Sequence, residues 1–338
     1  MKLKIALLCG GYSEEAEVSF NSADFVEQNL NRERYDIYKI KISPEQWLYK
    51  NEEGSTYSID RNDFSLTIEG KKVHFNLIFM MIHGSPGENG LLQGYFEMLG
   101  LPYTCCDSLT SSLTMNKAYT KAILNGIPDL FLAKSVQLFE EDRAKAPSII
   151  QSKLRLPIFV KPNAGGSSIG MSKVEKAADI ESAIKLAFNT KNTGKQVLVE
   201  EFVSGREFSV GVYKFNDIIK VLPATEVITE NAFFNYDAKY IPGLTQEITP
   251  AEINEEQINR MERIVKDIYL KLNCKGLIRI DFFFENGTNN FYFIEVNTIP
   301  GQTKTSFIPQ QIRAAGKTEK AFYTEWIEDT LLSFTTEN

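Results

Sequence analysis

Three short apolar runs of this chain each lead directly into a loop of small and polar residues. The runs span residues 2–8, 75–82 and 157–162, and the loops span 10–19, 83–90 and 163–170. A strand followed by such a loop is typical of α/β folds, in which ligands bind beyond the carboxyl ends of the strands. We therefore expect an α/β fold with α+β elements, and we look to these loops for the functional residues.

Length and composition narrow the classes of protein that fit this pattern. The 338 residues suffice for two or three domains with separate cores, and a hydrophobic content of 43% is that of a globular chain. The net charge of −7 argues against a general nucleic-acid binder. The two histidines, His74 and His83, cannot build a zinc or di-iron site without many further ligands.

The cysteines and the N-terminus predict a reduced, cytoplasmic protein. The four cysteines show no CxxC spacing, which disfavours zinc ribbons and thioredoxin-like chemistry. The first apolar run is about five residues long, too short for a signal peptide or a membrane span. We therefore expect cytoplasmic localisation and no contact with membranes.

Periodicity predicts further elements along the chain. The expected strands span 35–42, 197–202, 207–215, 218–224, 278–285 and 291–296, and the expected helices span 91–99, 111–124 and 178–188. Residues 226–249 lack periodicity and predict a long functional loop. Thr249 and Glu252 predict a capping box for the helix that follows, which carries one apolar face.

The predicted hairpin of residues 278–296 carries two acids whose contact depends on its register. If its turn is centred at residue 288, Asp281 lies opposite Glu295, and Arg279 lies opposite Asn297. Two opposed carboxylates repel unless one is protonated or a cation lies between them. Two acids and an amide oxygen suit Mg²⁺ better than zinc. The alternative is an exposed edge strand on which Asp281 pairs with a lysine.

The three loops each allow a functional and an ordinary interpretation. The glycines of residues 163–170 allow close approach of backbone N–H groups to an anion beside Lys161, or they form a plain linker. His83 is either a general base or a turn histidine bonded to the backbone. Glu14 and Glu17 fit the electrostatics of a helix start, whereas the role of Glu15 stays open.

Taken together, these segments resemble the D-alanine–D-alanine ligases of the ATP-grasp superfamily. The resemblance covers about residues 4 to 316 and rests on long, ordered motifs. They are GGYSEEAEVS, HGSPGENGLLQGYFEMLGLPYT, MNKAYTK, VKPNAGGSSIGMSKV, YDAKY, GLIRIDFFFE and EVNTIPGQTKTSFIP.

The resemblance implies a three-domain ATP-grasp architecture. An N-terminal α/β domain with a parallel sheet would span residues 1–104, a central subdomain 105–198, and a C-terminal subdomain 199–338 with a mobile lid at about 226–249. It also implies an ATP-dependent ligase that joins two D-alanine molecules through a D-alanyl phosphate, for peptidoglycan precursors and thus for cell wall biogenesis and cell shape. The implied cofactors are two Mg²⁺ ions, with Mn²⁺ as a substitute and K⁺ activation left open, and the implied assembly is a homodimer.

The resemblance also carries the family's roles onto residues of this chain. Glu15, linked to Ser167 and Tyr240, would hold the ammonium of the first D-alanine, near His83 and Glu88. Arg279 and the backbone of Gly301 would stabilise the oxyanion, Ser306 would bind the second carboxylate, and Lys239 belongs to the lid. The implied nucleotide contacts are Lys117, Lys161, Glu200, Glu201, Val203 and Glu207. The implied metal ligands are Asp281, Glu295 and Asn297.

Two positions depart from the family pattern. Ala16 stands where the family usually has an arginine, and Thr305 stands where some members have a histidine. Relatives that use D-lactate or D-serine as the second substrate tend to change the tyrosine that matches Tyr240. The intact YDAKY motif therefore favours the D-alanyl dipeptide over these two alternatives. A nucleotide-binding protein without ligase activity would have lost part of the Arg279 and Asp281 set.

Overall fold

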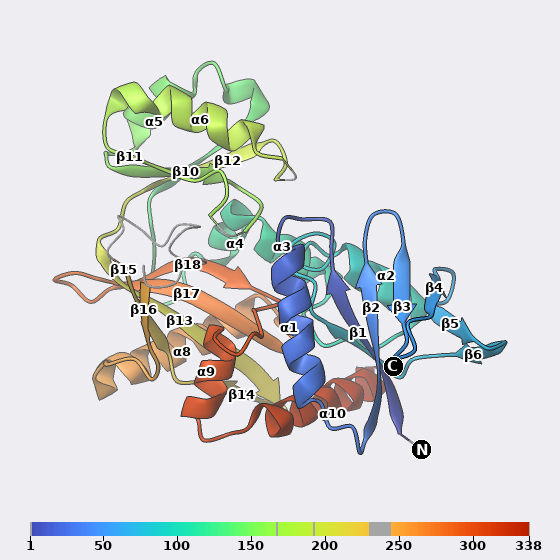
Figure 1. The fold of residues 1–338 in the computed structure, drawn as a ribbon. Helices are drawn as coiled ribbons and strands as arrows, with labels where there is room; N and C mark the ends of the chain where they lie inside the picture. Colours follow the sequence, from blue (N-terminus) through green and yellow to red (C-terminus); the bar gives the residue numbers. More distant parts are fainter. Residues whose placement is uncertain (1, 167, 192, 230–244, 338) are drawn as a thin grey trace.

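The computed structural model describes residues 2–166, 168–191, 193–229 and 245–337, which form three sheets with helices packed on them (Figure 1). Each sheet contributes to its own cluster of buried hydrophobic side chains. The mixture of strands and helices confirms the predicted α/β class. The predicted Ser167, Lys239 and Tyr240 lie outside the described residues.

The first sheet has the strand order β6-β5-β4-β3-β2-β1-β7. Its strands are β1 Leu3–Gly10, β2 Tyr35–Ile42, β3 Trp47–Lys50, β4 Thr56–Asp60, β5 Ser65–Ile68, β6 Lys71–Val73 and β7 Leu77–Met80. The predicted parallel arrangement holds for β2, β1 and β7, whereas β3 to β6 extend the sheet as an antiparallel meander that the sequence analysis did not predict. Helix α1 (Ala16–Asn29) packs on β1, and α2 (Leu91–Leu99) has the predicted bounds.

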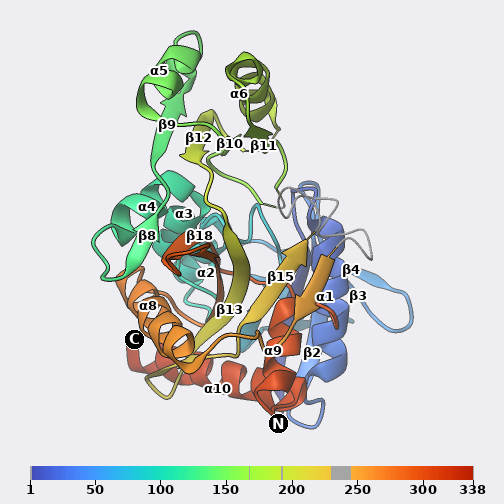
Figure 2. The same ribbon diagram turned by 90° about the vertical axis from the view of Figure 1, so that its left-hand side faces the viewer.

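The second sheet is antiparallel, with the order β11-β10-β12-β9. Its strands are β9 Ser135–Phe139, β10 Ile158–Pro162, β11 Ser172–Val174 and β12 Gln196–Glu201. Helices α5 (Ala146–Lys153) and α6 (Ile180–Asn189) cover one of its faces, and η1 (Glu140–Asp142) and η2 (Ala177–Asp179) are short 3₁₀ turns. Figure 2 shows this layer standing over the third sheet.

The third sheet has the order β16-β15-β13-β17-β18-β8, and β14 pairs with β13. Its strands are β8 Leu130–Leu132, β13 Gly205–Phe215, β14 Ile218–Val221, β15 Thr225–Thr229, β16 Thr245–Ile248, β17 Leu277–Glu285 and β18 Phe291–Asn297. The helices are α3 Ser108–Met115, α4 Lys117–Leu124, α8 Glu255–Lys271, α9 Phe307–Ala314 and α10 Glu319–Glu337. The ends of the predicted loop 226–249 are therefore strands, since 225–229 and 245–248 pair as β15 and β16.

Two predicted helix boundaries differ from the structure. The predicted helix 111–124 is two helices, because Asn116 is extended and its side chain caps α4 by accepting a hydrogen bond from the Tyr119 N–H. The capping box predicted at Thr249 and Glu252 is wrong. The box is formed by Asn254 and Gln257, three residues apart at the start of α8.

The predicted register of the hairpin is confirmed. Asp281 lies opposite Glu295, and Arg279 lies opposite Asn297. The register shifts by one residue between Asp281 and Phe282, because a β-bulge intervenes on the way to the turn. The bulge matters for the site, since it places Glu295 and Asn297 on the face of the sheet that carries Asp281.

Candidate active site

Arg279 and Asp281 form the centre of the site on the open face of the third sheet. The Arg279 guanidinium donates to both oxygens of Asp281, with Nε–Oδ1 at 2.9 Å and Nη2–Oδ2 at 2.8 Å. Ser209 Oγ donates to Asp281 Oδ1 at 2.7 Å, and Asn297 Nδ2 donates to Oδ2 at 3.1 Å. Burial opposes the charge of Arg279, but Asp281 raises the pKa of the guanidinium above its ordinary range. Asp281 is buried and pairs with an arginine, so the alternative of an exposed edge strand with a lysine partner is wrong.

A cavity between the second and third sheets collects most of the residues predicted to bind a nucleotide. It is lined by residues that include Lys117, Lys161, Glu200, Glu201, Val203, Glu207, Arg279, Asp281 and Glu295. Apolar side chains of both sheets, such as Phe159 and Phe293, complete its walls. Two lysines at the base of an otherwise acidic and apolar cavity suit a ligand with a polyanionic end and a flat apolar end.

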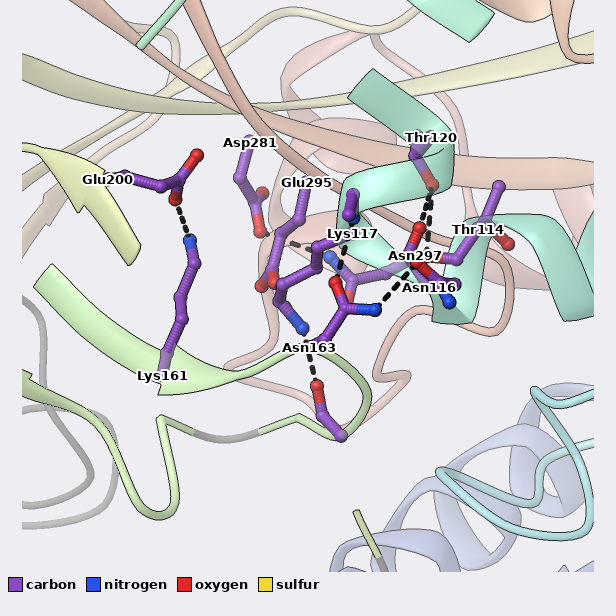
Figure 3. Close-up of polar contacts among 12 residues, drawn as sticks. Thr114, Asn116, Lys117, Thr120, Lys161, Asn163, Glu200, Asp281, Glu295 and Asn297 are labelled. Carbon is purple, nitrogen blue, oxygen red and sulfur yellow. Dashed lines mark hydrogen bonds and ion pairs between the residues drawn. The ribbon is translucent and has the colours of Figure 1, made fainter. Parts of the chain in front are cut away.

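Glu200 forms a buried ion-pair cluster in this cavity. Its two oxygens are held by Lys121 and Lys161, one lysine on each. Figure 3 shows the pair with Lys161. Burial raises the pKa of Glu200, but the two lysines outweigh it and hold this pKa at about 2. Sequence reasoning assigned no role to Lys121, although it lies one helical turn after Lys117 within the quoted motif MNKAYTK.

Lys117 stands at the first position of α4 and faces the glycine-rich loop. Its Nζ donates to the Gly165 carbonyl at 2.6 Å and lies 3.5 Å from Glu295 Oε2. Asn163 fixes this arrangement, because its Nδ2 donates to Asn116 Oδ1 at 2.7 Å and its Oδ1 accepts from the Ala118 N–H at 2.9 Å (Figure 3). The loop is therefore a positioned element of the site and not a plain linker.

Glu15 lies where the three loops found in the sequence meet. A Cβ atom added to Gly84 would come within 2.8 Å of Glu15 Oε2, and one added to Gly166 would come within 2.8 Å of Oε1. The side chain is thus packed between glycines of two other loops, which admit it because they have no side chain. This packing places Glu15 beside both loops, and its role stays a prediction.

A second cavity, of about 330 Å³, lies between the first and third sheets. Its walls include the predicted Glu15, His83, Glu88, Arg279, Glu295, Asn297, Gly301 and Ser306, together with Thr305. Ser306 is the N-cap residue of α9, and its Oγ accepts from the Thr303 N–H at 3.0 Å. Gly301 lies beside it, since an added Cβ would stand 3.1 Å from Ser306 Oγ.

His83 is buried, and both of its ring nitrogens have partners. Nε2 lies 3.1 Å from Ser22 Oγ, and Nδ1 lies 2.9 Å from the Ile299 carbonyl. The carbonyl can only accept, so Nδ1 carries the proton and Nε2 accepts from Ser22. Burial lowers the pKa of His83, which favours the neutral ring. His83 therefore joins α1 to the loop before α9, and the interpretation as a bonded turn histidine fits better than that as a general base.

Glu88 connects its own loop, residues 83–90, to the segment before α9. Its Oε2 accepts from the Gly84 N–H at 2.8 Å, and its Oε1 accepts from the Ile299 N–H at 3.1 Å. Burial, reinforced by the charge of Glu15, raises the pKa of Glu88 to about 7. Ser22, which sequence reasoning missed, also accepts from the Gln302 N–H at 3.2 Å.

The oxygen atoms near the centre of the site fit a hard divalent cation. Asp281, Glu295 and Asn297 supply two carboxylates and an amide oxygen across two paired strands, which is a donor set that Mg²⁺ prefers. In residues 2–166, 168–191, 193–229 and 245–337, no group of three or more His, Cys, Asp or Glu could hold a metal ion.

Glu201 and Glu207 also line the cavity between the second and third sheets. Glu201 accepts from the Arg155 N–H at 3.0 Å and pairs with the Arg155 guanidinium at 3.2 Å.

Within the described part of the chain, no helix has both the length and the apolar character needed to cross a membrane.

Comparison with known proteins identifies relatives along nearly the whole chain. A family model described as D-ala D-ala ligase N-terminus matches residues 4–106, and one described as D-ala D-ala ligase C-terminus matches residues 126–328. A D-alanine–D-alanine ligase of Azobacteroides pseudotrichonymphae is 42% identical over 96% of this chain and 98% of its own length. That of Phocaeicola vulgatus is 42% identical over 97% and 99%.

Solved structures show the same architecture. The VanG D-Ala:D-Ser ligase of Enterococcus faecalis superimposes with a TM-score of 0.86 at 30% identity, covering 98% of this chain and 100% of that one. D-alanyl-alanine synthetase A of Vibrio cholerae gives a TM-score of 0.85 at 28% identity, covering 98% and 99%. These scores confirm the three-sheet fold.

Proposed function

The chain belongs to the family of D-alanine–D-alanine ligases, and we propose that it joins two D-alanine molecules into D-alanyl-D-alanine with hydrolysis of ATP to ADP and phosphate. The family makes this dipeptide for peptidoglycan. Two further expectations, a cytoplasmic location and a homodimeric state, remain proposals, as do the domain limits at residues 104 and 198.

The observation that carries the proposal is that two cavities share a wall. Arg279 and Glu295 line both the nucleotide cavity and the second cavity that contains Glu15 and Ser306. A phosphate at the end of the first cavity would therefore meet a carboxylate in the second, beside a guanidinium. Such an arrangement suits phosphoryl transfer to a carboxylate, which depends mainly on positioning and on neutralising charge.

We assign the residues to steps of this reaction. Lys117 and Lys161 hold the phosphates of ATP, and Glu15 holds the ammonium of the first D-alanine so that its carboxylate points at Arg279. Glu200, Glu201, Val203 and Glu207 contact the adenine and ribose. Asp281, Glu295 and Asn297 would hold Mg²⁺, which neutralises phosphate charge when bound.

The second half of the reaction takes place in the second cavity, at the end that contains Gly301 and Ser306. Ser306, next to Gly301, binds the carboxylate of the second D-alanine, and Arg279 with the Gly301 N–H stabilises the oxyanion of the tetrahedral intermediate. His83 and Glu88 hold the wall of the first amino-acid site. Ser167, Lys239 and Tyr240 keep their proposed roles, in the substrate link and the lid.

The experiment that tests the proposal measures products directly. The protein is supplied with ATP, Mg²⁺ and an equimolar mixture of D-alanine, D-lactate and D-serine, and mass spectrometry quantifies the products. We expect D-alanyl-D-alanine to dominate, as in the curated relatives at about 42% identity. If D-alanyl-D-serine or D-alanyl-D-lactate dominated, the choice of second substrate would be contradicted. If no phosphate were released with D-alanine, with D-lactate or with D-serine, ligase activity would be contradicted.

A further inference from the structure

Glu247 is an acid on β16 that no role above includes. Residues directly opposite one another in paired strands share a face, and Glu247 is paired with Val227, which is paired with Glu207. Glu207 lies two residues from Ser209 along β13, and Ser209 is paired with Asp281. Because residues i and i+2 of a strand share a face, Glu247 lies on the same face of the sheet as Asp281.

The side chain of Glu247 lines the amino-acid cavity. The same cavity is lined by Arg279, Gly301 and Ser306, the groups assigned to the oxyanion and to the second carboxylate. Glu247 and Thr305 also line an outer groove of about 640 Å³ that is open to solvent. Glu247 thus stands between the solvent and the site of the second amino acid.

Gln310 of α9 fixes the Glu247 carboxylate. Its Nε2 donates to Glu247 Oε2 at 2.6 Å and to the Thr305 carbonyl at 2.7 Å, so both amide protons are used. Among the described residues, Glu247 Oε1 has no hydrogen-bond partner. Burial raises the pKa of Glu247, against the opposing effects of Gln310 and of the Arg279 charge.

We propose that Glu247 is a further catalytic residue, the base that takes a proton from the ammonium group of the second D-alanine. The inference rests on the proposed function. A D-alanine at neutral pH arrives with a protonated amine, which has no lone pair for attack. A carboxylate in the same cavity, held by Gln310 on Oε2 and with no partner on Oε1 among the described residues, is placed to accept that proton.

The proton transfer to Glu247 is followed by attack of the free amine on the D-alanyl phosphate. An N–H bond of the ammonium breaks and an O–H bond forms on Glu247. The free amine lone pair then forms the C–N bond to the carbonyl carbon of the D-alanyl phosphate. As the tetrahedral intermediate collapses, the C–O bond to phosphate breaks, phosphate leaves with the electron pair, and the second proton of the nitrogen passes to the departing phosphate.

The charged surroundings of Glu247 come from several elements. The groups that share its two cavities are Glu15, His83, Glu88, Arg279, Glu295, Lys304, Arg313 and Glu319. Arg313 is paired with Glu319, and Arg279 with Asp281. Since Glu247 must be ionised to act, the turnover number should fall on the acid side as Glu247 becomes protonated.

The test compares Glu247→Gln with the wild type, because glutamine keeps the shape and can still accept from Gln310 but cannot take a proton. We expect kcat for the dipeptide to fall by about 100-fold or more, with the part of the acid limb that Glu247 causes lost and the part due to Glu88 kept. The matched control is Glu252→Gln. Glu252 is an exposed glutamate a few residues after β16 that lines neither cavity, and the variant should behave as wild type.

A second nucleophile separates a chemical role from a structural one. Hydroxylamine is largely unprotonated at neutral pH and traps the D-alanyl phosphate as a hydroxamate. Glu247→Gln should form hydroxamate at the wild-type rate, because the first half-reaction and an already neutral nucleophile do not need the base. An unchanged kcat and pH profile, or an equal loss of both products, would overturn the role of Glu247. A wild-type protein that forms no dipeptide would instead refute the proposed function.

Discussion

At the scale of single residues, Glu200 couples stability to pH. Its carboxylate is buried between Lys121 and Lys161, and its pKa lies at about 2 in the folded protein, against an ordinary value of 4.5. A pKa that is lowered on folding contributes stability above the unfolded value, and this contribution disappears as the pH falls through the folded value. Glu200 therefore stabilises the fold at neutral pH and ceases to do so between about pH 4.5 and pH 2.

We predict that Glu200→Gln lowers the free energy of unfolding at pH 7 by about 3 kcal/mol, since each pKa unit corresponds to about 1.4 kcal/mol. Urea unfolding at pH 7 and at pH 3 measures the effect, and the difference from wild type should shrink at the lower pH. Glu141→Gln, at an exposed position of η1, is the control and should be neutral. A destabilisation that does not change with pH would contradict this account.

At the scale of elements, α9 closes an opening in the third sheet. Strand β13 pairs with β15 through residues 207–209 and with β14 through residues 212–215, which leaves a gap between the two partners. Gln311 fills it from α9. Its Oε1 accepts from the Gly211 N–H at 2.8 Å, and its Nε2 donates to the Ser209 carbonyl at 2.9 Å and to Thr225 Oγ1 at 3.0 Å.

We predict that Gln311→Leu lowers the free energy of unfolding by about 2 to 3 kcal/mol, because it leaves a buried N–H and a buried carbonyl without partners. Chemical denaturation followed by circular dichroism measures the change. Gln46→Leu, at an exposed position before β3, is the matched control and should change stability by less than about 0.5 kcal/mol. Equal effects of the two substitutions would show that α9 does not support β13 in this way.

At the scale of the whole molecule, α10 ties the first sheet to the third (Figure 1). Phe79 of β7 contacts Trp326 of α10, with ring centroids 5.1 Å apart, and Tyr323 at 6.0 Å. On the same helix, Phe322 contacts Tyr213 of β13 at 4.9 Å. The two ends of the chain therefore share one hydrophobic cluster, although about 250 residues separate Phe79 from α10.

We predict that Phe79→Ala costs about 3 to 5 kcal/mol of unfolding free energy, because Phe79 is fully buried and the helix cannot close the cavity. In a Trp47→Phe background, where Trp326 is the remaining tryptophan, fluorescence and circular dichroism should report the same shift of the urea midpoint, since the first sheet and α10 unfold together. Phe139→Ala, at a side chain that is 42% exposed, is the control and should cost much less. Separate transitions in the two signals would mean that α10 does not couple the sheets.

The contacts that the sequence predicts well are local ones. The opposition of Asp281 to Glu295 and of Arg279 to Asn297 followed from strand periodicity and a short turn, and the structure confirms it. The bounds of α2 followed from a helical apolar pattern flanked by glycines. Such features are encoded by residues a few positions apart, so that the chain itself restricts the choices. The motifs likewise identify the family, because each is a run of neighbouring residues.

Only the tertiary structure decided which distant groups meet. The Lys121 partner of Glu200 lies 79 positions away, and Glu88 accepts from an N–H 211 positions away. The meander of β3 to β6 and the hydrogen bonds of His83 were likewise decided by the tertiary structure. The sequence by itself determined several strands and helices, the three loops and the chemical types of the site. The packing of the three sheets determined which of these distant residues pair. Such long-range contacts depend on packing that a local sequence pattern does not record.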